Sequence, residues 1–154
     1  YRRHKAAGID YSAAPATKGD KIAKRASICG VLVVLALVGV LMFTGSITYT
    51  ITDSALQIEA TYHSDALVTY DQIDAIELRA DFNIGYRAMG YNSAKLSLGA
   101  YRNDEFGTFT LYAYTSCDSM IIIHSDGKVL AFNCATAPET EELFKQLLTK
   151  CGNG

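Results

Sequence analysis

Residues 107–134 read GTFTLYAYTSCDSMIIIHSDGKVLAFNC, and this stretch contains three runs that are typical of β-strands. The runs cover residues 107–114, 120–124 and 128–133, and they are rich in β-branched and aromatic side chains. Ser125-Asp126-Gly127 joins the last two runs, and Asp-Gly readily adopts the positive φ angles of a tight hairpin turn. We therefore predict an antiparallel hairpin in which His124 lies opposite Lys128.

Apolar and polar residues also alternate in the segments upstream of this stretch, as they do in half-buried strands. The segments are 47–51, 55–60, 66–70 and 73–78, with turn-forming residues between them. They predict a four-stranded meander. Residues 81–105 alternate less regularly, because Gly85, Gly90 and Gly99 interrupt a run of tyrosines.

The end of the chain has the features of one helix over about residues 137–150. Thr136 and Glu139 have the spacing of a capping box, and Pro138 suits a first helical turn. An apolar stripe predicts that the helix covers an open side of the sheet; it consists of Leu143, Phe144, Leu147 and Leu148.

Residues 26–45 form an apolar run, and the chain has no charged residue between Arg25 and Asp53. About 20 helical residues reach roughly 30 Å, the thickness of bilayer hydrocarbon. A buried core helix of this length would have a polar face. A cleaved signal peptide would need small residues at a cleavage site, and none follow Phe43 at the required spacing. The run therefore predicts a single transmembrane helix.

Charge is distributed unevenly about this helix. Residues 1–25 contain seven Lys or Arg and two acids, whereas residues 46–154 contain seven basic and fourteen acidic residues. The positive-inside rule places the polar, flexible leader (1–25) in the cytoplasm and the domain (46–154) outside it. An acidic domain is unsuited to nucleic acid. Because the chain begins at Tyr1, we expect the natural polypeptide to start further upstream.

No group of residues in the sequence has the spacing of a catalytic, cofactor or metal site. His4, His63 and His124 stand far apart, and none has a Cys or His at ligand spacing. Residues 85–90 lack the Lys-Ser or Lys-Thr that completes a phosphate loop. Adjacent residues such as 124–126 do not make a nucleophile, base and orienter in sequence. We therefore expect no enzymatic activity.

Two sets of residues remain as candidates for a structural or binding role. The predicted hairpin brings Cys117 within one residue of the position opposite Cys134, and an oxidising compartment would permit a disulfide between them. Tyr86, Arg87 and Tyr91 border the irregular middle segment, where amphipathic rings could line a groove for a peptide or glycan. The alternative is that the tyrosines pack the barrel.

The residues also resemble a known family. The resemblance rests on Gly90-Tyr91, Gly99-Ala100-Tyr101, residues 107–114, the 121–128 hairpin and Ala137-Pro138-Glu139 before a Phe-containing helix. These are similar to the bacterial pleckstrin-homology (PH) domains at the C-terminus of small membrane proteins. The resemblance covers roughly residues 47–148. It implies an α+β fold, with a PH-like, partly open β-barrel of about seven antiparallel strands capped by a C-terminal helix.

The family brings no catalytic residues, so the resemblance and the anchor together indicate a membrane-anchored interaction module. We expect an integral membrane location and either a protein partner or self-association. Binding of a lipid headgroup or another small ligand is the alternative. Residues 46–79 argue against a headgroup site among the first strands, because they contain six acids and Arg79 as the single base.

Overall fold

The structure is a computed structural model that describes residues 18–152. Its first element is helix α2 (Lys18–Phe43), which is 26 residues or about 39 Å long. No residue of α2 is buried, and its large apolar side chains are exposed on all sides. The helix is long and apolar enough to cross a membrane. It begins eight residues before the predicted span. The leader was predicted to be flexible, and its residues 1–17 lie outside the described residues.

A three-stranded antiparallel sheet follows, in the order β1-β2-β3. Its strands are β1 (Ile47–Ile51), β2 (Ala55–Ala60) and β3 (His63–Thr69). The predicted four-stranded meander is wrong in its last member. A short 3-10 turn, η1 (Tyr70–Gln72), redirects the chain, and the next strand joins the other sheet.

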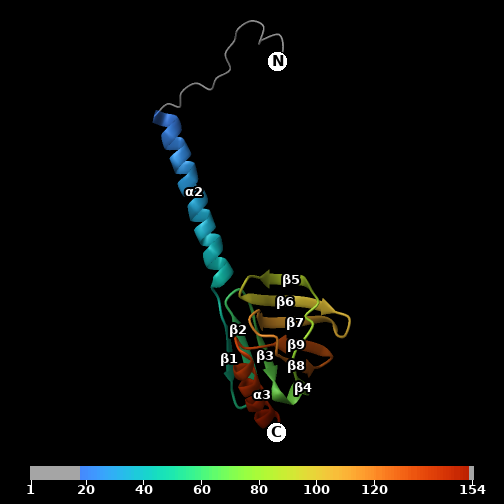
Figure 1. The fold of residues 1–154 in the computed structure, drawn as a ribbon. Helices are drawn as coiled ribbons and strands as arrows, with labels where there is room; N and C mark the ends of the chain where they lie inside the picture. Colours follow the sequence, from blue (N-terminus) through green and yellow to red (C-terminus); the bar gives the residue numbers. More distant parts are fainter. Residues whose placement is uncertain (1–17, 153–154) are drawn as a thin grey trace, which may run out of the picture. The chain divides into compact units, whose positions relative to one another are not determined.

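The second sheet has six strands in the order β4-β8-β9-β7-β6-β5 (Figure 1). Its strands are β4 (Ile73–Arg79), β5 (Tyr86–Asn92), β6 (Leu96–Asn103), β7 (Gly107–Tyr114), β8 (Met120–Ser125) and β9 (Lys128–Phe132). Neighbours are antiparallel except β7 and β9, which are parallel. The described residues thus form nine strands, where about seven were predicted, and β5 and β6 lie in the segment that looked irregular.

The glycines of that segment allow two strands to approach closely. Gly90 on β5 faces Gly99 on β6, with φ angles of +133° and +120°. A Cβ atom on Gly90 would lie 2.1 Å from the carbonyl oxygen of Leu98. Glycine is therefore required at this point, where β5 also carries a bulge.

The hairpin between β8 and β9 is confirmed, with a register one residue from the prediction. Asp126 and Gly127 both have positive φ (49° and 72°), as a two-residue type I′ turn requires. Ser125 therefore pairs with Lys128, and His124 lies opposite Val129.

The main core lies between the two sheets and helix α3 (Ala137–Gly152). The Thr136 hydroxyl accepts a hydrogen bond from the Glu139 amide (3.4 Å), which is one of the two bonds of the predicted capping box. Leu143 and Leu147 are buried, whereas Leu148 is 44% exposed and lies outside the core. The sheets do not close into a barrel, so the domain has the partly open PH-like architecture that was predicted.

Candidate interaction surfaces

A groove lies beside β3, at the opening between the two sheets. It has a volume of about 240 Å³ and is lined by residues of β3, β7, β8 and β9 and the turns beside them, including Ala66, Leu67, Val68, Val129 and Leu130. We call it the β3 groove. No described strand pairs with the outer edge of β3, and Leu67 on that strand is 66% exposed. The groove therefore has apolar and polar side chains beside an unpaired strand edge; the polar ones are Gln72, Thr110, Ser125, Asp126 and Lys128.

The other end of the same opening is closed by a side chain. The Tyr112 hydroxyl donates a hydrogen bond to the carbonyl of Ser64 (2.6 Å), and the His63 and Tyr112 rings lie 5.5 Å apart. This contact joins the start of β3 to β7, so the accessible part of the edge begins near Ala66.

A second cluster of contacts surrounds the last turn of α2, which belongs to the same compact unit as the domain. The final carbonyls of a helix lack partners within the helix. The Tyr91 hydroxyl donates a hydrogen bond to the Leu41 carbonyl (2.5 Å), and the Lys95 amine donates one to the Gly45 carbonyl (2.7 Å). Since the last turn of α2 has no basic residue of its own, Lys95 supplies the positive charge that stabilises a helix C-terminus.

Aromatic stacking supports this junction. The rings of Tyr62 and Tyr91 lie 4.7 Å apart, and the hydroxyls of Tyr62 and Thr44 are hydrogen-bonded (2.8 Å). Gly45 has φ +93°, and a Cβ there would lie 2.7 Å from the Tyr62 ring. The roles of Lys95 and Tyr62 could not be predicted from the sequence, because their partners are backbone and side-chain atoms of residues far away in the chain.

The three residues singled out in the sequence do not form one site. Tyr86 and Arg87 are exposed near the start of β5, whereas Tyr91 lies at its far end and is half-buried in the junction. The Arg87 guanidinium donates a hydrogen bond to the carbonyl of Gly90, three residues further along the same strand (3.4 Å). The proposed role of these residues in ligand or partner binding stays a prediction.

A charged network links β4, β8 and the β6–β7 turn. Arg79 forms ion pairs with Glu77 (2.8 Å) and Glu105 (2.6 Å), and His124 contacts Glu77 (3.0 Å). The hydrogen bond from Arg79 is the main reason that the pKa of Glu77 is lowered. Each carboxylate thus has a partner, so the network holds the turn against the sheet.

Cys117 and Cys134 are free thiols on either side of Thr140. The Cys117 sulfur lies 3.7 Å from the Thr140 hydroxyl, which accepts a hydrogen bond from the Cys134 amide (3.0 Å). Burial raises the pKa of Cys134 from 9.0 to about 11. The disulfide is not formed in this structure, and the pairing stays a prediction.

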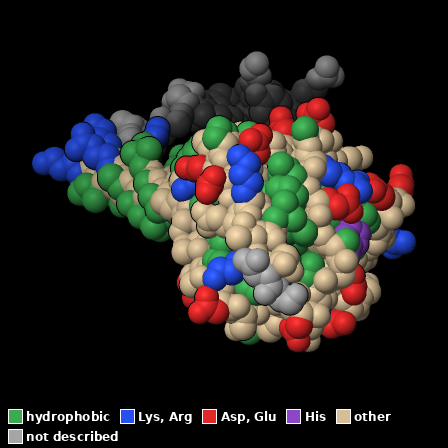
Figure 2. All heavy atoms as spheres, turned by 90° about the horizontal axis from the view of Figure 1, so that it is seen from below, with side chains coloured by type: hydrophobic (Ala, Val, Ile, Leu, Met, Phe, Trp, Pro, Cys, Tyr) green, Lys and Arg blue, Asp and Glu red, His purple; other side chains and the backbone are tan. Residues whose placement is uncertain are grey.

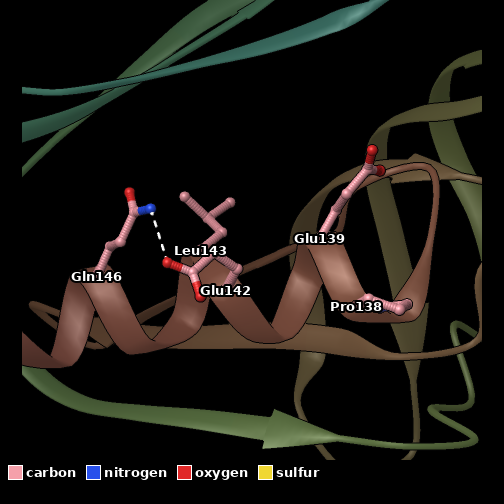
Figure 3. Close-up of a pocket in the computed structure, with 5 residues that line it drawn as sticks. All are labelled: Pro138, Glu139, Glu142, Leu143 and Gln146. Atoms are coloured by element: carbon pink, nitrogen blue, oxygen red, sulfur yellow. Dashed lines mark hydrogen bonds between the residues drawn. The ribbon is translucent and has the colours of Figure 1, made fainter.

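The remaining hollows are less suited to a partner. One of about 380 Å³ lies against α3 and is lined by Pro138, Glu139, Glu142, Leu143 and Gln146 (Figure 3). In this hollow Gln146 donates a hydrogen bond to Glu142 (3.2 Å). Within residues 18–152, no group of three His, Cys, Asp or Glu side chains could hold a metal ion. Figure 2 shows acidic side chains around the domain, in accord with its net negative charge.

A three-stranded antiparallel sheet and a six-stranded mixed sheet, closed at one side by a C-terminal helix, define the class of PH-like domains. Residues 47–151 match the family model for the bacterial PH domain, and the chain belongs to this family. The match runs from the start of β1 to the last turn of α3 and excludes α2. No curated protein and no solved structure matches the chain.

Proposed function

We propose that this chain is a membrane-anchored, non-enzymatic interaction module that binds a protein segment along the outer edge of β3. The observation that carries the proposal is Leu67, which is 66% exposed on a strand with one unpaired edge, beside a groove that is partly lined by apolar side chains. Natural proteins usually blunt or cover such an edge, because it pairs readily with another chain. A functional partner is one reason to retain it.

The groove favours an extended segment over a compact ligand. An unpaired strand offers main-chain N–H and C=O groups in a row, which an added strand satisfies along its length. The apolar lining from β9 can receive alternate side chains of that strand, while Lys128 and Asp126 at the turn provide charged contacts. The segment can come from another protein or from a second copy of this chain.

The anchor would tether this domain to a membrane. Helix α2 provides the apolar length, and Lys18, Lys21, Lys24 and Arg25 precede its apolar part. By the positive-inside rule, these residues support a cytoplasmic N-terminal end and an extracytoplasmic domain. The partner would then be an extracytoplasmic segment.

Co-purification from detergent-solubilised native membranes tests the β3 edge. The full chain is compared with Leu67→Lys, which places a charge on the edge, and with Leu148→Lys, a matched control on the exposed side of α3. The proposal predicts a bound protein, or an oligomer of the chain, that Leu67→Lys loses and Leu148→Lys retains. Equal recovery from all three chains, or no bound species from any, would contradict it.

A further inference from the structure

The β5–β6 hairpin is the basic part of an otherwise acidic domain. Residues 82–103 contain Arg87, Lys95 and Arg102 and no acid, whereas the rest of the domain (46–81 and 104–154) contains four basic and fourteen acidic residues. Arg87 and Arg102 are exposed, and no ion pair among the described residues involves either. This hairpin therefore attracts anions where the rest of the domain repels them.

Strand register places its exposed apolar residues and Arg102 on one face. Leu98, Ala100 and Arg102 alternate along β6, so they point to the same side of the sheet. Their partners on β5 are Tyr91, Met89 and Tyr86, and partners in register share a face. We call Tyr86, Met89, Tyr91 and Arg102 the hairpin face. Met89 is 76% exposed and Tyr86 is 62% exposed, so the face presents two large, largely apolar side chains to its surroundings.

One end of the hairpin face lies where the chain leaves helix α2. Tyr91 bonds to the carbonyl of Leu41, which is part of the apolar run, and Lys95 bonds to Gly45 just beyond it. A strand rises about 3.3 Å per residue, so Met89 and Tyr86 lie about 7 Å and 17 Å along β5 from Tyr91. If the apolar run that ends at Phe43 crosses a bilayer, Leu41 lies at its end, and Tyr91 is bonded to Leu41 within one compact unit.

We propose that the hairpin face rests on the anionic phospholipids of the bilayer that α2 crosses. Tyr86 and Tyr91 are the amphipathic rings that favour the headgroup level, and Met89 adds an apolar side chain that can enter the acyl region. The guanidinium group of Arg102, on the same face, matches phosphate geometry. The inference rests on the anchor in the proposed function, but it does not depend on a protein partner at β3.

A lipid surface is the partner of the hairpin face because it explains the basic residues and the exposed apolar residues together. A soluble anion would explain the arginines but not the exposed Met89 and Tyr86. An apolar protein partner would explain Met89 and Tyr86 but not the absence of acids over residues 82–103. A bilayer surface accounts for both features, and Tyr91 is hydrogen-bonded to Leu41, a residue of the apolar run that would enter it.

The chain contains no tryptophan, so a single introduced Trp reports its own surroundings. Met89→Trp places the probe on the hairpin face, and Leu67→Trp places a matched probe on the exposed β3 edge. Each full-length variant is reconstituted in vesicles of phosphatidylcholine alone or mixed with phosphatidylglycerol, with acyl chains brominated near the headgroup. We expect several-fold stronger quenching and a blue-shifted emission for Met89→Trp, and neither for Leu67→Trp.

Charge is tested in the same system. In the Met89→Trp background, Arg102→Glu should reduce quenching in vesicles with phosphatidylglycerol. Quenching of Met89→Trp itself should be stronger in those vesicles than in phosphatidylcholine alone. Equal quenching of Met89→Trp and Leu67→Trp, or quenching indifferent to both charge changes, would overturn the inference. Tyr86→Trp provides a second probe on the same face should Met89→Trp alter the fold. Vesicle flotation is checked first, because a chain that fails to float contradicts the anchor itself.

Discussion

The Tyr91 hydroxyl on β5 is hydrogen-bonded to the main-chain carbonyl of Leu41, fifty residues earlier in the chain. This bond gives a partner to a carbonyl at the C-terminal end of α2 that would otherwise have none within the helix. It therefore couples the order of the last helical turn to the β5–β6 hairpin.

Tyr91→Phe removes this bond and keeps the ring that stacks on Tyr62. A hydrogen bond of this kind contributes about 1 kcal/mol, so local opening of the junction should become roughly five-fold more frequent. Hydrogen exchange of the full chain in lipid nanodiscs should show faster exchange at the amides of residues 44–46. Tyr86→Phe is the control, and identical exchange in Tyr91→Phe and the unmodified chain would contradict the role given to this bond.

Gly90→Ala should destabilise the domain by about 2–3 kcal/mol. The new Cβ combines an unfavourable positive φ with a 2.1 Å approach to the Leu98 carbonyl. Gly107→Ala is a matched control, because Gly107 also has a positive φ (+67°) but nothing lies within 4 Å of its Cβ position. Urea denaturation in detergent, followed by circular dichroism, measures both. Equal losses would mean that backbone conformation alone, and not the close approach, determines the cost.

Tyr101→Phe should leave the domain as stable as before, or raise its stability by about 1 kcal/mol. The Tyr101 hydroxyl is buried and has no hydrogen-bond partner among the described residues, so its removal relieves a desolvation cost. The same denaturation experiment gives the result. A loss of stability would show that the hydroxyl has a partner, such as an internal water. Tyr112→Phe is the contrasting variant, since it removes the bond to Ser64 and should be destabilising.

The segments that the sequence predicted well have strong local signals. The apolar run before Phe43, the Asp126-Gly127 turn and the Thr136 cap each act through neighbouring residues, and all three are present in the structure. The type of fold followed from these elements and from the family resemblance.

The strand pairings and contacts that the sequence did not predict involve residues far apart in the chain. Residues 73–78 alternate as a strand should, but nothing local indicates that β4 pairs with β8 rather than β3. Gly90 and Gly99 looked like interruptions because glycine is uncommon in strands. In the structure they lie opposite each other on β5 and β6, which no local pattern indicates. The junction contacts of Tyr91 and Lys95 involve backbone carbonyls about fifty residues away, which no spacing rule can find.

The Cys134 thiol should react slowly with iodoacetamide at pH 8 and faster as the pH rises toward 11. Burial raises its pKa to about 11, and only the thiolate is nucleophilic, so a rising pH increases the reactive fraction. Mass spectrometry of protein that was purified without reductant identifies the labelled residue. Labelling of Cys134 and Cys117 that requires prior reduction would instead establish the disulfide expected from the sequence.

Membrane anchoring by α2 is the claim on which the proposed function and the lipid contact both depend, and alkaline extraction tests it most directly. Membranes containing the full chain are washed at high pH, which strips peripheral proteins, and are then floated on a density gradient. An apolar helix with no buried residue should keep the chain with the floating bilayer. Release of a folded, detergent-free chain into the wash would contradict the account.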